Sequence, residues 1–103
     1  MKIPYEVNGR MLVYAIPQEL DHHVAKDLCR ELDMLVDSYQ IRELVLDFAQ
    51  TEFMDSSGIG VIIGRCKTMQ FHGGTICAKN LGRRVQTIFE SAGLYKIIHI
   101  VEE

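Results

Sequence analysis

The fold is decided by a short and nearly continuous apolar run, Leu44-Val45-Leu46-Asp47-Phe48. A run of this kind is typical of a strand that lies in a parallel sheet and is covered on both faces. Apolar residues recur at helical spacing both before and after it. Strands that alternate with helices predict an α/β fold with a mostly parallel sheet and right-handed crossovers.

Upstream of this run, the sequence predicts a β-hairpin followed by a helix. Ile3 to Val7 alternates apolar and polar residues, Asn8-Gly9 is a strong hairpin signal, and Met11 to Ile16 continues as a second strand. Asp21 is of a residue type that caps helix N-termini, and we expect it to cap the first helix. The apolar face of that helix comprises Ala25, Leu28, Cys29, Leu32, Leu35 and Val36.

Downstream, two more helices alternate with two more strands. The sequence predicts a helix from about Ser57 to Phe71 and a buried strand from Thr75 to Ala78. A third helix is expected from about Gly82 to Ala92, with Gly93 as a left-handed cap. Ile97 to Val101 is predicted to form the last strand.

Composition narrows the possible functions. The chain of 103 residues is 48% hydrophobic and 24% charged, which predicts one globular domain over residues 1–103. No apolar run reaches the roughly 18 residues of a membrane span, and the opening residues do not resemble a signal peptide. We therefore expect a cytoplasmic protein without membrane contact. The net charge of −3 and the absence of a sustained basic run argue against direct nucleic-acid binding.

The sequence predicts no metal ion and no cofactor. Cys29, Cys66 and Cys77 are widely spaced and are expected to be reduced, mostly buried thiols. His22 and His23 are adjacent, and neighbouring side chains on a helix point about 100° apart, so these two cannot chelate one ion together.

Residues 54–65, Met-Asp-Ser-Ser-Gly-Ile-Gly-Val-Ile-Ile-Gly-Arg, join a strand region to a helix. Asp55, Ser56 and Ser57 are all good N-cap residues, and capping alone would explain them. The glycines at 58, 60 and 64 each cost about 1 kcal/mol in a helix. Gly60 and Gly64 lie four residues apart, and they leave room either for close packing within the domain or for the surface of a partner.

This segment is expected outside the carboxyl end of a parallel strand, where open α/β sheets usually place their sites. The start of a helix offers free N–H groups and the positive end of a dipole, which tolerate a phosphate. A phosphoserine there would add about −1.5 to −2 charges. Phosphorylation is therefore expected to preserve the fold and to act on a bound partner.

Four stretches match a known family in the same order along the chain. They are Glu19 to His23, Phe53 to Ile62, Gly73-Gly74 and Ser91 to Ile98. The chain resembles the sporulation anti-anti-sigma factors of the STAS domain class over nearly its whole length, and Phe53 to Ile62 is similar to their phosphorylation motif. The resemblance implies a STAS-type α/β fold, in which helices pack on a mixed, mostly parallel sheet opened by an N-terminal hairpin.

The resemblance also implies a function. In that family the unphosphorylated protein binds an anti-sigma factor, which is a serine kinase using Mg-ATP, and so releases a sigma factor. Phosphate on the first serine after the motif aspartate, here Ser56, ends this binding, and a serine phosphatase restores it. Spacing alone leaves open whether Ser56 or Ser57 is the acceptor. The implied partner-binding residues are Asp21, His22, His23, Asp55, Ser57, Gly58 and Gly60.

Two departures from the family pattern affect the expected interface. Pro17-Gln18 stands where the sporulation proteins usually have a glycine turn, so the loop that meets the partner is expected to differ. The chain also stops soon after the last predicted strand, where family members of this type usually continue into a further helix. These departures bear most on which anti-sigma factor the protein is expected to bind.

Two other functions are compared with this regulatory one, a hydrolase and a ligand-binding module. A serine hydrolase needs a Gly-x-Ser-x-Gly elbow and a histidine base held by an acid, and the sequence shows neither, so we expect no enzyme. A STAS module of a stress or transport assembly that binds a nucleotide or small ligand is the stronger alternative, since a helix N-terminus also accepts nucleotide phosphates. The sequence has no Walker-type lysine after a glycine loop, which disfavours it.

Overall fold

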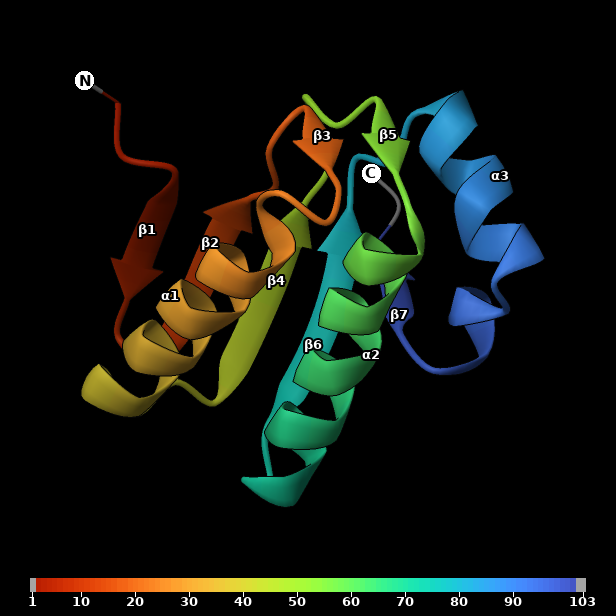
Figure 1. Cartoon of the computed structure of the whole chain (residues 1–103). Helices are drawn as coiled ribbons and strands as arrows, with labels where there is room; N and C mark the ends of the chain where they lie inside the picture. Colours follow the sequence, from red (N-terminus) through yellow and green to blue (C-terminus); the bar gives the residue numbers. More distant parts are fainter. Residues whose placement is uncertain (1, 102–103) are drawn as a thin grey trace.

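The computed structural model describes residues 2–101, so both ends of the domain predicted over residues 1–103 lie outside the described residues. Figure 1 shows the path of the chain. The elements are β1 (Tyr5–Asn8), β2 (Met11–Ala15), β3 (Glu19–Leu20), α1 (Ala25–Ser38), β4 (Glu43–Asp47), β5 (Phe53–Met54), α2 (Ser56–Phe71), β6 (Thr75–Lys79), α3 (Arg83–Ser91), the 3-10 turn η1 (Leu94–Lys96) and β7 (His99–Val101). The predicted succession of hairpin, helix, strand, helix, strand, helix and strand is confirmed, with β3 and β5 in addition.

Five strands form one sheet in the order β1-β2-β4-β6-β7. The strands β1 and β2 form the predicted antiparallel hairpin, and its turn contains Gly9 with a φ of +60°. All other neighbours in this sheet are parallel. Parallel neighbours need long crossover connections, and α1, α2 and α3 each lie in one of them.

Within residues 2–101, helices cover one face of the sheet and leave the other without a helix. Figure 1 shows α1 and α2 side by side on the same face, where Leu44 and Leu46 are fully buried. Val45 belongs to the opposite face, where it lines a shallow depression together with Val13 and Cys77. The expectation that this strand is covered on both faces is therefore wrong for the described residues. Val45 is still only 8% exposed, because the register places Val13 and Cys77 on either side of it.

The core lies between the sheet and its helices. Phe48 follows β4 and meets Phe89 of α3 edge to face, with ring centroids 5.3 Å apart, which ties α3 to the end of that strand. Full burial of one large apolar side chain contributes about 1.5–3 kcal/mol. The largest fully buried side chains are Phe48, Phe89, Leu12, Ile16, Leu20, Leu32, Ile41, Leu44, Leu46, Ile62, Met69 and Leu94.

The strands β3 and β5 form a separate two-stranded parallel sheet, with Leu20 opposite Met54. Sequence analysis missed this pair, because two residues are too short to show a periodic pattern. Both strands lead directly into the segments that precede α1 and α2. The pair therefore sets where the two helices begin.

The last strand is shorter than predicted. Gly93 has a φ of +71° and ends α3 as expected. The chain then forms η1, in which the N–H groups of Ile97 and Ile98 donate to the carbonyl of Leu94. Ile97 and Ile98 therefore belong to a turn, and the strand β7 begins only at His99.

Within residues 2–101, no helix combines the length and apolar character needed to cross a bilayer. The same part of the chain contains no group of three or more His, Cys, Asp or Glu side chains placed to hold a metal ion. Cys29, Cys66 and Cys77 are free thiols and are half-buried. Burial raises the pKa of the Cys66 and Cys77 thiols, which keeps both protonated at neutral pH.

Candidate functional site

Three connecting segments meet at one edge of the main sheet, namely the edge formed by the C-terminal ends of its parallel strands. The parallel strands β2, β4 and β6 all end there, and the chain leaves them through residues 16–24, 48–55 and 80–82. This edge is at the upper end of the molecule in Figure 1, where α1, α2 and α3 also begin. Ser56 is the first residue of α2 and lies at this edge, which is where open α/β sheets place their sites.

Asp55 is the N-cap of α2. Its backbone is extended, and its Oδ1 accepts hydrogen bonds from the N–H groups of Ser57 at 2.9 Å and Gly58 at 3.1 Å. Both N–H groups belong to the first turn, where no carbonyl of the helix is available to them. Of the three capping candidates in the sequence, Asp55 is the one that caps. The helix consequently begins at Ser56, one residue earlier than predicted.

The second carboxylate oxygen of Asp55 reaches the loop before α1. Asp55 Oδ2 accepts a hydrogen bond from the backbone N–H of His22 at 3.0 Å and lies 3.4 Å from Nδ1 of the His22 ring. The N–H of Asp55 donates in turn to the carbonyl of Leu20 at 3.3 Å. Two segments that are 33 residues apart in the sequence are thereby joined directly beside Ser56.

Asp21 does not cap α1, contrary to the prediction. The helix begins at Ala25, and Val24 occupies its N-cap position without a side-chain hydrogen bond. Asp21 instead shapes the turn before the helix, since its Oδ1 accepts the N–H of His23 at 2.9 Å and its carbonyl accepts the N–H of Ala25 at 3.0 Å. The turn leaves the rings of His22 and His23 exposed, with their centroids 4.0 Å apart.

Gly58 has a packing role. It is buried, and a Cβ added to it would lie 2.3 Å from the carbonyl oxygen of Leu20, which is far inside van der Waals contact. The start of α2 can approach β3 only because residue 58 has no side chain. Sequence analysis missed Leu20 as a residue that positions the site, because nothing in the sequence marks the two-residue strand to which it belongs.

Gly60 and Gly64 lie in open space. A Cβ added to either would meet no atom within 4 Å. Close packing within the described part of the chain therefore does not explain these two glycines.

Ser56 and Ser57 differ in accessibility. Ser56 is exposed, whereas Ser57 is half-buried and its N–H is held by Asp55. Of the two hydroxyl groups, that of Ser56 is therefore the more accessible to another protein.

The Asp55 carboxyl has a pKa below its ordinary value. Desolvation raises this pKa, but hydrogen bonds from Gly58, His22 and Ser57 to the carboxylate outweigh it. Asp55 is therefore negatively charged at neutral pH and adds a fixed charge beside Ser56.

We expect Asp55 to make the stability depend on pH in the acid range. Its folded pKa is lowered, so its contribution is present above the unfolded value of about 3.9 and is lost as the pH falls through the folded value. Asp55→Asn keeps an oxygen that can cap α2 and removes the charge, and it also replaces the oxygen that accepts the His22 N–H by an NH2 group that cannot accept. The difference between the two free energies of unfolding in urea should be largest at neutral pH and should shrink as the pH falls through the folded pKa of Asp55. A difference that stays constant with pH would contradict this role.

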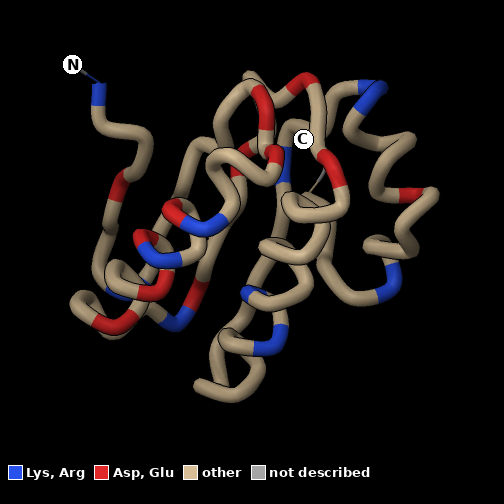
Figure 2. Tube along the Cα trace, in the orientation of Figure 1, with Lys and Arg blue, Asp and Glu red and all other residues tan. Residues whose placement is uncertain are grey.

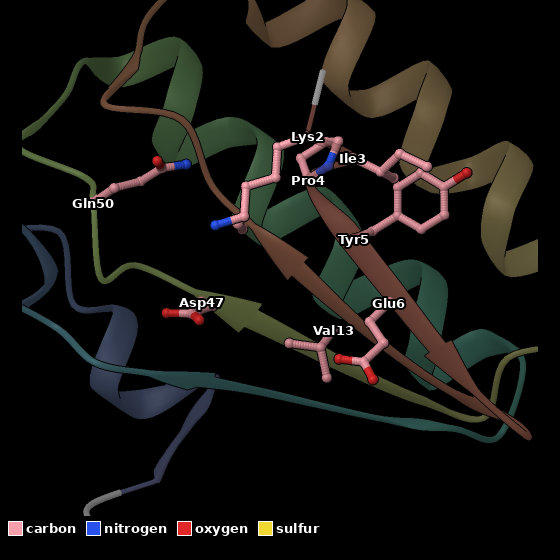
Figure 3. A pocket seen from close by; sticks show the side chains of 9 residues that line it. Lys2, Ile3, Pro4, Tyr5, Glu6, Val13, Asp47 and Gln50 are labelled. Carbon is pink, nitrogen blue, oxygen red and sulfur yellow. The ribbon is translucent and has the colours of Figure 1, made fainter.

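A separate hollow lies beside this edge. Figure 3 shows a pocket of about 380 Å³ between the N-terminal segment, β2 and the end of β4. Asp47, which lines it, also joins two loops, since its Oδ1 accepts hydrogen bonds from the N–H of Ala49 at 2.9 Å and from the side-chain amide of Asn80 at 3.0 Å. None of the predicted site residues lines this pocket. The lining includes two carboxylates, Glu6 and Asp47, and one cation, Lys2, a balance of charge that disfavours the phosphates of a nucleotide.

Comparison with known proteins gives the same family from sequence and from structure. A model of the STAS domain family matches residues 2–103. The anti-sigma F factor antagonist of Paenibacillus polymyxa is 31% identical over 102 residues, which cover 99% of this chain and 87% of that protein. The anti-sigma-B factor antagonist of Bacillus subtilis is 33% identical over 85 residues, covering 82% of this chain and 76% of that protein.

A solved structure of the anti-sigma factor antagonist SpoIIAA in its unphosphorylated form has the same fold. It matches with a TM-score of 0.82 at 25% identity, over 96% of this chain and 87% of that one. The predicted fold class is confirmed, with an antiparallel hairpin opening a mostly parallel sheet that carries three helices. The chain belongs to the STAS domain family and is one of its anti-sigma factor antagonists.

Proposed function

We propose that the unphosphorylated protein binds an anti-sigma factor that is a serine kinase, and that this binding releases a sigma factor. Phosphorylation of Ser56 ends the binding. Anti-sigma factor antagonists are regulators and not enzymes. The observation that carries the proposal is an exposed serine at the first position of α2, next to a surface that Asp55 assembles from two distant segments.

The proposed binding surface has two parts. One is the turn before α1, with Asp21 and the exposed rings of His22 and His23. The other is the start of α2, where Ser57 and Gly60 follow the cap. Asp55 belongs to both parts, because its two carboxylate oxygens bind one part each. Gly58 is buried, so it contributes by letting the two parts meet.

A phosphate on Ser56 would change the charge of this surface without unfolding it. It adds about −1.5 to −2 charges, and the positive end of α2 tolerates them. The N–H groups of Ser57 and Gly58 already donate to Asp55, however, so they are not free to neutralise a second anion. The added charge and bulk therefore project into the binding surface beside a carboxylate that is ionised, and enclosing this unneutralised charge opposes binding.

The switch requires a phosphatase as well as a kinase. A serine phosphatase that removes the phosphate would restore the binding form, and we place this cycle in the cytoplasm. The protein needs no contact with DNA or with a membrane for this role, because it acts on the anti-sigma factor. The solved relative is in an unphosphorylated form, which supports a switch between phosphorylated and unphosphorylated protein.

We expect Ser56→Ala to abolish phosphorylation by the anti-sigma kinase that the protein binds. The substitution removes the acceptor oxygen of the phosphate and leaves the cap intact, because the hydrogen bonds from α2 to Asp55 come from the backbone N–H groups of Ser57 and Gly58. The measurement is phosphate uptake from Mg-ATP, followed by peptide mass spectrometry. Nearly all uptake should be lost.

Ser57→Ala is the matched control, since it removes the neighbouring hydroxyl and keeps the N–H that donates to Asp55. It should accept phosphate as the original protein does. Uptake that survives in Ser56→Ala and disappears in Ser57→Ala would move the switch by one residue. If the original protein and both single variants all fail to take up phosphate, the proposal is contradicted.

A further inference from the structure

Two exposed arginines begin α3. Arg83 and Arg84 are its first two residues, and Gly82 occupies the N-cap. Gly82 makes no side-chain cap, and the first turn contains no acidic residue. Both arginines therefore lie at the positive end of the helix dipole, where cations are unfavourable. Helix formation gives no reason for a basic pair at this position.

No acidic side chain within the described part of the chain offsets these charges. The ion pairs closer than 4.0 Å in residues 2–101 involve two other basic residues, His22 and Arg65. Arg83 and Arg84 are exposed and unpaired there. Residues that lower stability and have no partner in their own chain are commonly kept for function.

The two arginines share an edge with Ser56. The strand β6 leads into α3 through residues 80–82, at the same edge where β2 and β4 end. The helix α3 also contacts β5, the strand that immediately precedes the Asp55 cap. Figure 2 shows basic residues in blue at the start of α3, on the right of the upper edge, and acidic residues in red on the neighbouring loops.

The charges at this edge are divided into two zones. Residues 16–24 and 48–55 contain Glu19, Asp21, Glu52 and Asp55 and have neither lysine nor arginine. The zone around Ser56 is therefore acidic, and the start of α3 is basic. A partner that covers both zones must present acidic side chains to the start of α3, which fixes its orientation and excludes partners with another charge pattern there.

We infer that Arg83 and Arg84 form a second contact for the anti-sigma factor and bind an acidic patch on its surface. The inference rests on the proposed function, and the contact continues the binding surface at Ser56. The arginine contact and Ser56 have different roles. The arginines attract and orient the partner whether or not Ser56 is phosphorylated, whereas the phosphate decides whether the complex persists.

The test measures binding of the anti-sigma factor to unphosphorylated protein at two salt concentrations. The variant Arg83→Glu with Arg84→Glu reverses the basic pair. Its control, Lys67→Glu with Lys96→Glu, makes the same change of charge at exposed residues in the second half of α2 and in η1. The arginine variant should bind at least about tenfold more weakly at low salt, chiefly through slower association, and the loss should shrink at high salt. The lysine variant should stay within about twofold of the original.

Thermal unfolding separates a binding defect from a folding defect. The arginine variant should melt at the same temperature as the original protein or higher, because acidic residues favour a helix start. Equal affinities of the two variants, or a loss of binding accompanied by a lower melting temperature, would overturn the inference alone. Failure of the original protein to bind the anti-sigma factor would overturn the proposed function and this inference with it.

Discussion

Gly58→Ala is expected to destabilise the protein by about 1–3 kcal/mol, although alanine usually strengthens a helix. The added Cβ would lie 2.3 Å from the carbonyl oxygen of Leu20 and 2.8 Å from its Cγ. A backbone oxygen cannot move aside as the end of a flexible side chain can. The start of α2 must therefore shift away from β3. This shift would also lengthen the hydrogen bond from the His22 N–H to Asp55.

Gly60→Ala is the matched control for that substitution. It adds the same methyl group two residues later in the same helix, where nothing lies within 4 Å. It should stabilise the protein by about 0.5–1 kcal/mol, because glycine is the poorer helix former. In a domain of this size, 1 kcal/mol shifts the melting temperature by about 4–8 °C, so thermal unfolding resolves both effects. Shifts of the same sign in the two variants would contradict the packing assigned to Gly58.

The sequence predicts the longer elements well because each has its own periodic pattern. The bounds of α2 differ from the prediction by one residue, and Gly93 has the left-handed backbone expected of a cap. The wrong predictions concern features that depend on how segments distant in the sequence meet in space. The strand β4 has the composition of a fully covered strand, yet its outer face is shielded by neighbouring strands and by no helix of the described residues.

The same distinction applies to the site. The cap and the serine beside it are consecutive residues, so a local motif indicates them. The link between Asp55 and His22 depends on the pairing of β3 with β5, which no local pattern predicts. For Asp21 the local pattern led to a wrong prediction. Its residue type suits a helix cap, but the chain turns once more before α1 begins.

The largest effect on binding is expected from the phosphate itself. Phosphorylated protein should bind the anti-sigma factor at least about 100-fold more weakly than unphosphorylated protein, which corresponds to about 2.7 kcal/mol. The dianion lies next to the ionised Asp55 carboxylate at the point where the partner must approach, and enclosing a charge that has no matched cation costs several kcal/mol. The fold should be unchanged, because the phosphate lies at the solvent-exposed start of α2.

Titration of the anti-sigma factor with two samples of this protein decides whether the phosphate is the switch. One sample is fully phosphorylated and the other unphosphorylated, and circular dichroism verifies that both are folded. The unphosphorylated sample should bind tightly, and the phosphorylated one at least about 100-fold more weakly. Equal affinity of two folded samples would contradict the claim that a phosphate on Ser56 switches the protein off.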